Sequence, residues 1–319
     1  MKKLLFLINP LSGSGAGKTL AGRINAAMQK RLPPHDYDIV FTDKEVGAHA
    51  GTIAPQYETV IVAGGDGTIN HTAGALIGLG NPPALGIIPL GTGNDLARSL
   101  GLLSVLKHKG LEALIDVFLE GSTRPVDVFT LGPRHGFISY AGFGRDAAVA
   151  GVFDRMRKKT PYRLLSSCGF SKLVYALLAL ACARQSCPAG LELNYQKADG
   201  STKNLCFTDP LCQLIISSIN SYGGGTCISS ASRMDDAQFE ITIMRNSPRW
   251  ILLHLARFTG RAYDDLAPAG SVFQAREASL LLPEAVPAQI DGETIKIEPK
   301  SRLDVQIAGR LMMTATPQS

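Results

Sequence analysis

The sequence predicts a two-domain protein in which an α/β N-terminal domain with a parallel sheet precedes a C-terminal antiparallel β-sandwich. Residues 1–125 repeat an apolar strand, a glycine-rich turn and an amphipathic helix, which is the pattern of βα units. Residues 126–299 change to short runs of alternating apolar and polar residues separated by Gly, Pro, Asn and Ser, which is typical of antiparallel sheets. A length of 319 residues also favours about two domains.

The elements follow from these patterns in chain order. In the first domain, strands are expected at 3–9, 37–42, 58–63 and 84–89, and helices at 19–32, 47–57, 69–80 and 96–102. In the second domain, strands are expected at 189–196, 213–220, 238–245, 278–283 and 302–309, with one helical insertion at 162–185. We expect the C-terminal segment 300–319 to return to the first domain.

Composition places the chain among ordinary globular proteins, with 45% hydrophobic and 18% charged residues. A formal net charge of +5 suits an anionic ligand or an anionic membrane surface and is too weak to indicate nucleic acid. The six cysteines show no CxxC spacing and no histidines at zinc-finger spacing, so we expect reduced thiols in a cytosolic protein.

No targeting or membrane-spanning segment is expected. The N-terminal run "MKKLLFLINP" is ended by Asn9-Pro10 without a small-residue cleavage site, so it is interpreted as a buried first strand. The longest apolar stretch, which starts at Leu164, is interrupted by serines and a lysine and is shorter in pure apolar run than the roughly 20 residues that a bilayer span needs.

The motif "GGDGT", Gly64 to Thr68, is the most informative glycine-rich turn. Such a turn between a strand and a helix usually binds an anion through its amide N–H groups, and a bare Asp66 would repel a phosphate. The conflict is resolved if Asp66 holds Mg²⁺ and the metal holds the phosphates. The alternative is that Asp66 is only a helix N-cap, although Thr68 could fill that role and leave Asp66 free.

Two further glycine-rich turns follow apolar strands. The run "SGSGAGKT" from Ser12 fails the Walker A pattern at its first residue, and it can serve as a phosphate loop or only as a turn. In "IIPLGTGND", Thr92 could bond a phosphate, while Asn94 and Asp95 could cap the next helix or contact a nucleotide. The ends of neighbouring parallel strands would bring these turns to one crevice.

The motif "QIDGE" near the C-terminus has two interpretations. Asp291 could accept the proton of an alcohol during phosphoryl transfer, which needs little more from a protein than positioning, charge neutralisation and one proton acceptor. Asp291-Gly292 between two alternating runs is also the usual sequence of a two-residue hairpin turn.

Together these motifs resemble a known family. The stretches "INPLSGSGAG", "VIVAGGDGTIN" and "LGIIPLGTGNDLAR", with "SINSYGGGTCISSASRMDDAQFEITIM" and "AQIDGE" further on, are similar to the diacylglycerol kinase catalytic family, which includes bacterial soluble lipid kinases and sphingosine and ceramide kinases. The resemblance covers nearly the whole chain. It implies an N-terminal domain like that of NAD kinase and phosphofructokinase, a C-terminal β-sandwich, and ATP in the cleft between them.

The resemblance also implies roles for particular residues. Asp291 would be the general base, Asp66 would organise Mg²⁺, and a structural Mg²⁺ would be bound by the Asp236 side chain and by the backbone at Arg233 and Gln238. The residues placed around ATP are Asn9, Pro10, Leu11, Ser12, Gly13, Thr42, Gly64, Gly65, Asp66, Gly67, Thr68, Ile69, Asn70 and Thr92.

Two positions depart from the family pattern. His71 stands where the family usually has Glu, and Ala237 stands where it usually has Gly. A glycine at that position can hold a positive φ, which alanine tolerates poorly.

These observations predict an ATP- and Mg²⁺-dependent kinase of a neutral lipid, with diacylglycerol as the first candidate acceptor and phosphatidate as its product. The alternatives are another lipid alcohol such as a sphingoid base or phosphatidylglycerol, an NAD kinase, or a nucleotide-binding regulatory protein without turnover. NAD kinases share "GGDGT", but their Gly-Ser-Thr-Ala-Tyr segment has no counterpart here.

A basic cluster precedes the long apolar stretch and suits peripheral contact with an anionic membrane, so we expect a cytoplasmic protein at the inner face of the membrane. Solvated charges before a buried helix explain the cluster equally well. The cluster comprises Arg155, Arg157, Lys158, Lys159 and Arg163.

Overall fold

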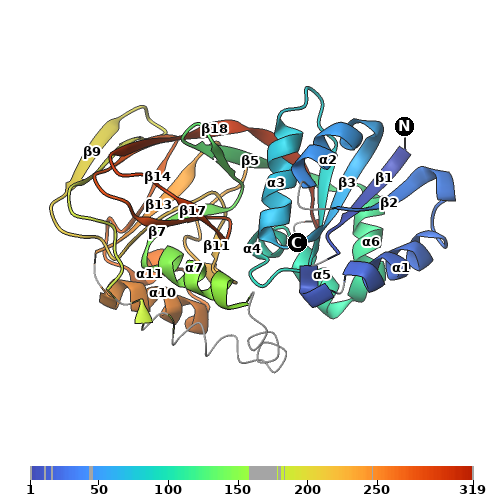
Figure 1. The fold of residues 1–319 in the computed structure, drawn as a ribbon, viewed down its shortest axis with the longest axis horizontal. Coiled ribbons are helices and arrows are strands. Elements are labelled where there is room, and N and C mark those ends of the chain that lie inside the picture. Colours follow the sequence, from blue (N-terminus) through green and yellow to red (C-terminus); the bar gives the residue numbers. More distant parts are fainter. Residues whose placement is uncertain are drawn as a thin grey trace.

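The computed structural model describes residues 2–10, 12–15, 17–42, 46–157, 178, 181–182, 184–245 and 247–317 (Figure 1). Leu11 and almost all of the predicted insertion at 162–185 lie outside these residues. Within the described residues, no helix is long and apolar enough to cross a membrane. The cysteines of this part of the chain are free thiols.

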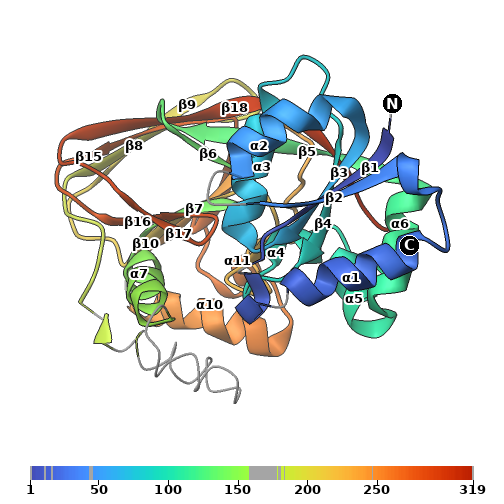
Figure 2. The same ribbon diagram turned by 45° about the vertical axis from the view of Figure 1, so that its right-hand side comes forward.

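The N-terminal half is built on four parallel strands in the order β2-β1-β3-β4. They are β1 (Lys2–Ile8), β2 (Tyr37–Phe41), β3 (Tyr57–Gly64) and β4 (Ala84–Pro89), and all four are apolar runs that the sequence predicts. Helices α2 (Val46–Ile53) and α3 (Asp66–Ile77) pack together on one face of this sheet, and α1 (Gly17–Met28), α5 (Leu102–His108) and α6 (Gly110–Glu120) cover the other (Figures 1 and 2). Burial on both faces explains why these strands are continuously apolar.

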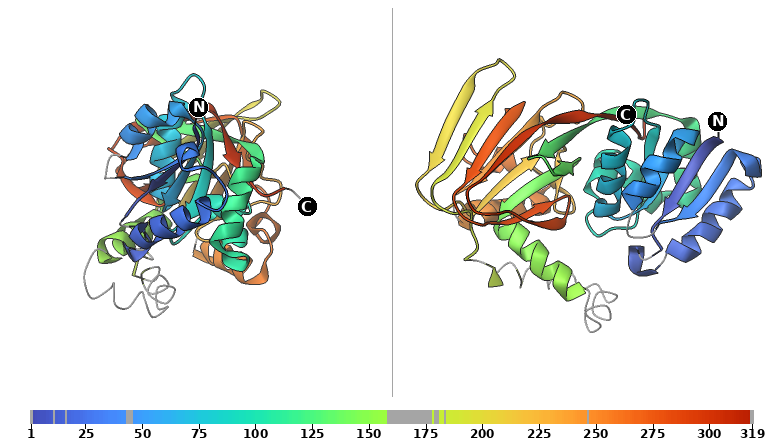
Figure 3. Two further views of the ribbon diagram at one scale, coloured as in Figure 1. Left: turned by 90° about the vertical axis from the view of Figure 1, so that its right-hand side faces the viewer. Right: turned by 45° about the horizontal axis from the view of Figure 1, so that its top comes forward.

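One long strand joins the two halves of the molecule. Strand β18 (Ser301–Thr314) pairs in parallel with β4 at Met313 and Leu85, and along its length it pairs antiparallel with β5 (Thr123–Leu131) and β15 (Glu277–Leu282). The parallel strands therefore belong to one ten-stranded sheet that continues through β18 and β15 into β8 (Leu191–Gln196) and β9 (Thr202–Phe207). Figure 3 shows β18 crossing from one half to the other.

The C-terminal half is an antiparallel sandwich. A second sheet lies against β18, β15 and β8, and its strands follow the order β14-β13-β10-β7-β16-β17. These strands are β7 (Tyr140–Gly144), β10 (Gln213–Ser217), β13 (Phe239–Met244), β14 (Val272–Ala275), β16 (Pro287–Ile290) and β17 (Glu293–Lys296). Side chains of both sheets form one buried cluster that includes Phe129, Phe143 and Phe239. The predicted fold class, α/β followed by an antiparallel sandwich, is confirmed.

Helices on the outer face of the second sheet were not predicted from the sequence. They are α7 (Arg145–Arg157) and α10 (Ser247–Thr259), with the short α11 (Tyr263–Leu266) beside α10. Of the predicted basic cluster, Arg155 is exposed on α7, whereas Lys158, Lys159 and Arg163 lie outside the described residues.

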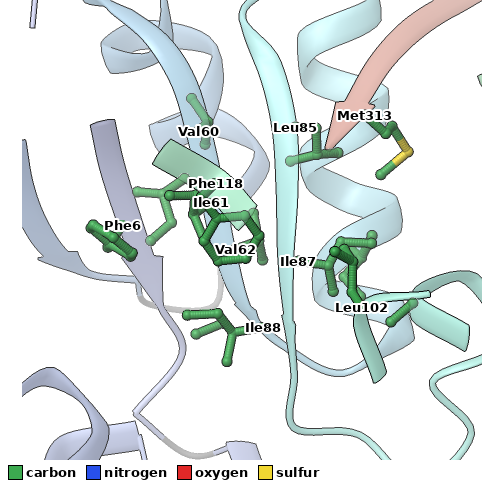
Figure 4. Close-up of a cluster of buried hydrophobic side chains, with 14 of the residues drawn as sticks. Phe6, Val60, Ile61, Val62, Leu85, Ile87, Ile88, Leu102, Phe118 and Met313 are labelled. Atoms are coloured by element: carbon green, nitrogen blue, oxygen red, sulfur yellow. The ribbon is translucent and has the colours of Figure 1, made fainter. Parts of the chain in front are cut away.

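Substitution of Met313 tests the role of β18 in the N-terminal core. Met313 is fully buried among the strands of the N-terminal half, next to Leu85 (Figure 4), and its neighbour Met312 is 44% exposed. We expect Met313→Ala to lower the free energy of unfolding by about 2–5 kcal/mol, because it leaves a cavity in the core. Met312→Ala on the same strand should change it by less than about 0.5 kcal/mol. Urea unfolding of both variants measures the difference, and equal effects would contradict this placement of β18.

Candidate active site

The glycine-rich turns meet where β1 and β3 lie side by side. In the order β2-β1-β3-β4 the chain leaves β1 and β3 toward opposite sides, and this is the point at which open α/β sheets bind ligands. Asn9, just after β1, donates its backbone N–H to Ala63 on β3 and its side-chain N–H to Thr68 Oγ1 (3.4 Å). The first two turns therefore contact each other.

Glycines let the second and third turns approach closely. A Cβ atom on Gly91 would lie 2.9 Å from the Cα of Gly65, and one on Gly93 would lie 3.0 Å from a carboxylate oxygen of Asp66. Asn94, with φ of 53°, closes the third turn by accepting the Gly91 N–H (2.9 Å) and donating to the Gly91 carbonyl (2.8 Å). Any side chain at these glycines would separate the two turns.

The other predicted nucleotide residues differ in what they can offer. Thr42 is buried, and its N–H and hydroxyl both donate to the Ile8 carbonyl. Ile69 is buried in the core, so only its backbone can face a ligand, and Asn70 donates to the Gly136 carbonyl across the interface between the halves. Thr92 is exposed on the third turn. Roles of these residues in nucleotide binding remain proposals.

Asp66 is the first residue of α3 and not its N-cap. Gly65 occupies the N-cap position in an extended conformation, with no capping side chain, and Thr68 lies inside the helix. A carboxylate oxygen of Asp66 accepts the backbone N–H of Asn94 (3.2 Å). Burial, together with the nearby charge of Asp95, raises the pKa of Asp66 to about 6, although the hydrogen bond from Asn94 opposes the shift.

Asp291 lies in the hairpin turn that one interpretation of the motif predicts, and its side chain is buried. Asp291 (φ 45°) and Gly292 (φ 85°) form the two-residue turn between β16 and β17, with both central residues at positive φ as in a type I′ turn. The Asp291 side chain is only 2% exposed, and its carboxylate accepts the backbone N–H groups of residues 138, 139 and 140 at 2.8–3.0 Å. The turn therefore places the buried carboxylate beside the start of strand β7.

Burial raises the pKa of Asp291 to about 7. The three amide hydrogen bonds oppose this shift, and the charge of Asp66 adds to it. A carboxyl group whose pKa is near neutral pH is suited to general base chemistry. Hydrogen bonds link the carboxylates of the two halves: Tyr140 donates to Asp291 and to Asp95, and Asn94, which precedes Asp95, donates to Asp66.

Asp95 is a third carboxylate at this site. The prediction that it caps the next helix is wrong. Asn94 holds the N-cap position of α4 (Asp95–Ser99), and no side chain caps this helix. Asp95 is buried and accepts hydrogen bonds from Tyr140 (3.2 Å), Ser221 (2.5 Å) and the backbone N–H of Gly224 (2.9 Å). It joins the third glycine-rich turn to the hairpin of β11 (Ser221–Tyr222) and β12 (Thr226–Cys227).

Of the three carboxylates, Asp66 is the one that fits a divalent cation, because Asp95 and Asp291 are engaged by several protein donors. Among the described residues, no arginine, lysine or histidine forms an ion pair with Asp66, Asp95 or Asp291. No group of three or more His, Cys, Asp or Glu in this part of the chain forms a dedicated metal cage. Mg²⁺ usually takes one or two carboxylates and completes its shell with water and substrate phosphates, so Asp66 alone could hold it.

Sequence reasoning missed Arg98, a cation that contacts the third turn. Its guanidinium donates to the carbonyls of Gly93 (3.4 Å) and Gly224 (3.2 Å), and the side chain is exposed. The sequence signal was its position one turn after "GTGND" on the same helix. Arg98 could offset phosphate charge at the second and third turns, since neither "GGDGT" nor "GTGND" contains a lysine.

His71 and Glu293 form a further contact between the halves. His71 Nε2 lies 3.2 Å from a Glu293 carboxylate oxygen, and this hydrogen bond raises the pKa of His71. A Cβ atom on Gly67 would overlap the same carboxylate. His71, which stands where the family usually has Glu, is thus a hydrogen-bonding partner of Glu293, the Glu of "DGE".

Comparisons with known proteins identify the family of the chain. Residues 3–131 match the model of the diacylglycerol kinase catalytic domain, and residues 136–294 match that of the diacylglycerol kinase accessory domain. A diacylglycerol kinase of Mycobacterium tuberculosis (strain CDC 1551 / Oshkosh) is 31% identical over 79% of this chain and 76% of its own length. The diacylglycerol kinase of Bacillus subtilis (strain 168) is 27% identical over 77% and 75%.

Structural comparison finds the same fold. A crystal structure from Bacillus anthracis str. Sterne, described as a diacylglycerol kinase, superposes with a TM-score of 0.66 at 18% identity and covers 99% of this chain and 97% of its own. The two family models place the chain in a class of phosphotransferases, the lipid kinases. The chain belongs to the diacylglycerol kinase family and is a diacylglycerol kinase-like lipid kinase.

The predicted structural metal site lies away from the glycine-rich turns, beside β5 and β18. Both carboxylate oxygens of Asp236 accept hydrogen bonds from Gln238, one from its backbone and one from its side chain (3.1 Å each). Ala237 has φ of 58°, the strained conformation that the usual glycine would adopt freely. Its N–H donates to the buried Asp127 (2.6 Å).

A guanidinium already supplies positive charge to this loop. Arg310 on β18 donates to Asp127 (2.6 Å) and to the backbone carbonyl of Asp235 (2.8 Å), and the charge of Asp236 also raises the pKa of Arg310. One carboxylate engaged by Gln238 next to an arginine does not fit a divalent cation site, so we derive no role for a structural Mg²⁺ from these contacts.

Removal of Arg310 should therefore destabilise the protein more than chelation does. We expect Arg310→Gln to lower the free energy of unfolding by about 2 kcal/mol, because it leaves the Asp127 carboxylate buried without a cation, and partial exposure of Arg310 reduces the effect. Arg302→Gln, which breaks an exposed pair with Asp304 on the same strand, should cost less than about 1 kcal/mol. Thermal unfolding with EDTA or Mg²⁺ provides the comparison, and a clear fall in Tm with EDTA would restore the metal interpretation.

Proposed function

We propose that the protein transfers the γ-phosphate of ATP, with Mg²⁺, to the hydroxyl group of diacylglycerol and so forms phosphatidate. The family accounts for a lipid kinase that uses ATP, while the acceptor and the metal are our proposals. The observation that carries them is the buried Asp291 carboxylate, which Tyr140 connects by hydrogen bonds to Asp95 at the third glycine-rich turn.

On the phosphate side, the protein supplies backbone and few charges. The backbone amides at the start of α3 would form an anion-binding surface. The second and third turns, which lie in contact at Gly65 and Gly91, would add their own amides to it. Mg²⁺ bound to Asp66 would neutralise phosphate charge there. A bound cation also favours the ionised form of Asp66, whose pKa is otherwise raised by burial and by Asp95.

On the acceptor side, Asp291 would take the proton of the attacking hydroxyl. One of its carboxylate oxygens accepts two of the three amide hydrogens and the other accepts one, so a lone pair is left for the substrate. The amides also fix the orientation of the carboxylate, which limits the reorganisation needed during the reaction. Transfer then requires mainly that hydroxyl and γ-phosphate are aligned in the crevice.

Asp291→Asn tests the assignment of the base. With labelled ATP and Mg²⁺, we expect kcat for label transfer into diacylglycerol to fall by about 10²–10⁴-fold, while the KM for ATP stays within about twofold. Asp209→Asn, an exposed carboxylate on the loop after β9, is the matched control and should keep full activity.

The same assay separates the alternatives. Sphingosine, phosphatidylglycerol and NAD serve as competing acceptors, and label in one of these but not in diacylglycerol would change the substrate while keeping the kinase. Unaltered transfer by a folded Asp291→Asn protein would exclude Asp291 as the base. ATP binding without transfer to any acceptor would favour the regulatory alternative.

The pH dependence of the wild type is a separate test. Asp291 accepts a proton only when ionised, and burial raises its pKa to about 7, so activity should be lost as the pH falls through that value. We expect kcat/KM to rise with pH along an acid limb with an apparent pKa near 7, and not near the value of about 4 that is usual for Asp. A flat profile from about pH 5 to about pH 8 would contradict a base with this environment.

A further inference from the structure

Helix α10 is apolar on two opposite faces. Leu253 and Ala256 point inward and pack in a buried cluster with Tyr222. On the outer face, Ile251, Leu255 and Phe258 are 58%, 44% and 86% exposed. Spacings of four and three residues place these three side chains in one stripe along the helix.

This stripe is in an unusual place for large apolar side chains. Figures 1 and 2 show α10 on the outside of the antiparallel half, next to α7. A surface helix normally turns polar residues outward, and one that is apolar all round is expected to have a partner on each side. The sandwich is the partner of the inner face, and the outer stripe requires another.

The charges around the stripe indicate which partner fits. From 245 to 261 the chain has no Asp or Glu, and its four arginines lie within α10 or next to its two ends. Those at 245, 257 and 261 are exposed, and the one at 249 is half-buried. The arginines flank the stripe at the two ends of the helix, and the nearest acidic residues in the sequence, Asp264 and Asp265, follow on α11. An apolar helix face flanked by arginines is typical of helices that lie in an anionic membrane interface.

The stripe is also connected to the active site. Arg257, between Leu255 and Phe258, donates to the carbonyl of Gly223 (3.1 Å), and the next residue in that hairpin, Gly224, donates to Asp95 at the third glycine-rich turn. The C-terminal end of α10 is therefore only two hydrogen-bonded contacts from Asp95. Tyr140 donates both to Asp95 and to Asp291, so a bilayer against this end would bring a membrane-embedded acceptor toward the site.

We propose that Ile251, Leu255 and Phe258, with the arginines around them, form the surface by which the protein docks on an anionic lipid bilayer. The proposal rests on the proposed function for its role in catalysis, since it explains how an acceptor held in a membrane is reached. Docking itself can be measured without turnover.

The test is co-sedimentation with vesicles of phosphatidylcholine and phosphatidylglycerol. We expect the wild type to bind them, to bind pure phosphatidylcholine vesicles more weakly, and to lose affinity as salt increases. Leu255→Ser/Phe258→Ser should reduce partitioning by about tenfold for each side chain removed from the interface. The matched control is Ile307→Ser/Met312→Ser, which removes two exposed apolar side chains from β18 and should bind like the wild type.

Three outcomes would overturn the proposal. Equal vesicle binding by both double variants would show that the stripe does not dock. A change from dimer to monomer in the α10 variant alone would make the stripe an interface between copies of this chain. A marked fall in Tm of that variant would show that the stripe is covered within the protein.

Kinase assays keep this proposal separate from the proposed function. A short-chain diacylglycerol dissolved as monomers does not require docking, so the α10 variant should phosphorylate it like the wild type and should be slower only with vesicles. Vesicle binding without phosphorylation of any lipid by the wild type would support docking and reject the proposed function. If the wild type phosphorylates diacylglycerol and both double variants are equally active on vesicles, the proposed function is supported and docking through the stripe is rejected.

Discussion

The site depends on two buried carboxylates, Asp95 and Asp291, whose hydrogen bonds are supplied by the C-terminal half of the chain. Asp95 belongs to the N-terminal half, and its carboxylate accepts hydrogen bonds from Tyr140, Ser221 and Gly224 of the C-terminal half. Asp291 lies in the hairpin turn between β16 and β17, and its carboxylate accepts hydrogen bonds from the backbone amides of residues 138–140, at the start of β7. An unsatisfied buried carboxylate is very costly, so the hydrogen bonds to Asp95 help to fix where the halves meet. Tyr140 donates to Asp95 through its hydroxyl and to Asp291 through its N–H, so it holds the two carboxylates near each other.

Local patterns were sufficient to predict the N-terminal half. The strands β1, β2, β3 and β4 lie within a few residues of their predicted ranges, because continuous apolar runs followed by glycine-rich turns have few other solutions. The turns carry their own geometry, as the contact of Gly65 with Gly91 shows. The sequence could not show that Asp66 begins α3 without capping it, since capping depends on backbone detail.

Long-range placement explains most of what the sequence could not predict. A two-residue Asp-Gly turn is fully explained by local rules, and nothing near Asp291 in the chain indicates that segment 138–140 will bury it. The helix α10 was missed because its residues are apolar on two faces and therefore show no single stripe. Arg310 was missed because its partners, Asp127 and the loop at Asp235, are distant in sequence.

The pairing of β18 with β4 has a consequence for how the chain folds. Thr314 contacts Leu85 across 229 positions of sequence, so during synthesis the edge of β4 stays without this neighbour until almost the whole chain has been made. Contacts between such distant residues are slow to form because a long loop must close first. An unpaired strand edge is also a site at which chains aggregate. The N-terminal half, although it resembles a self-sufficient nucleotide-binding unit, should therefore complete its sheet last, and its folding yield should depend on the final strand.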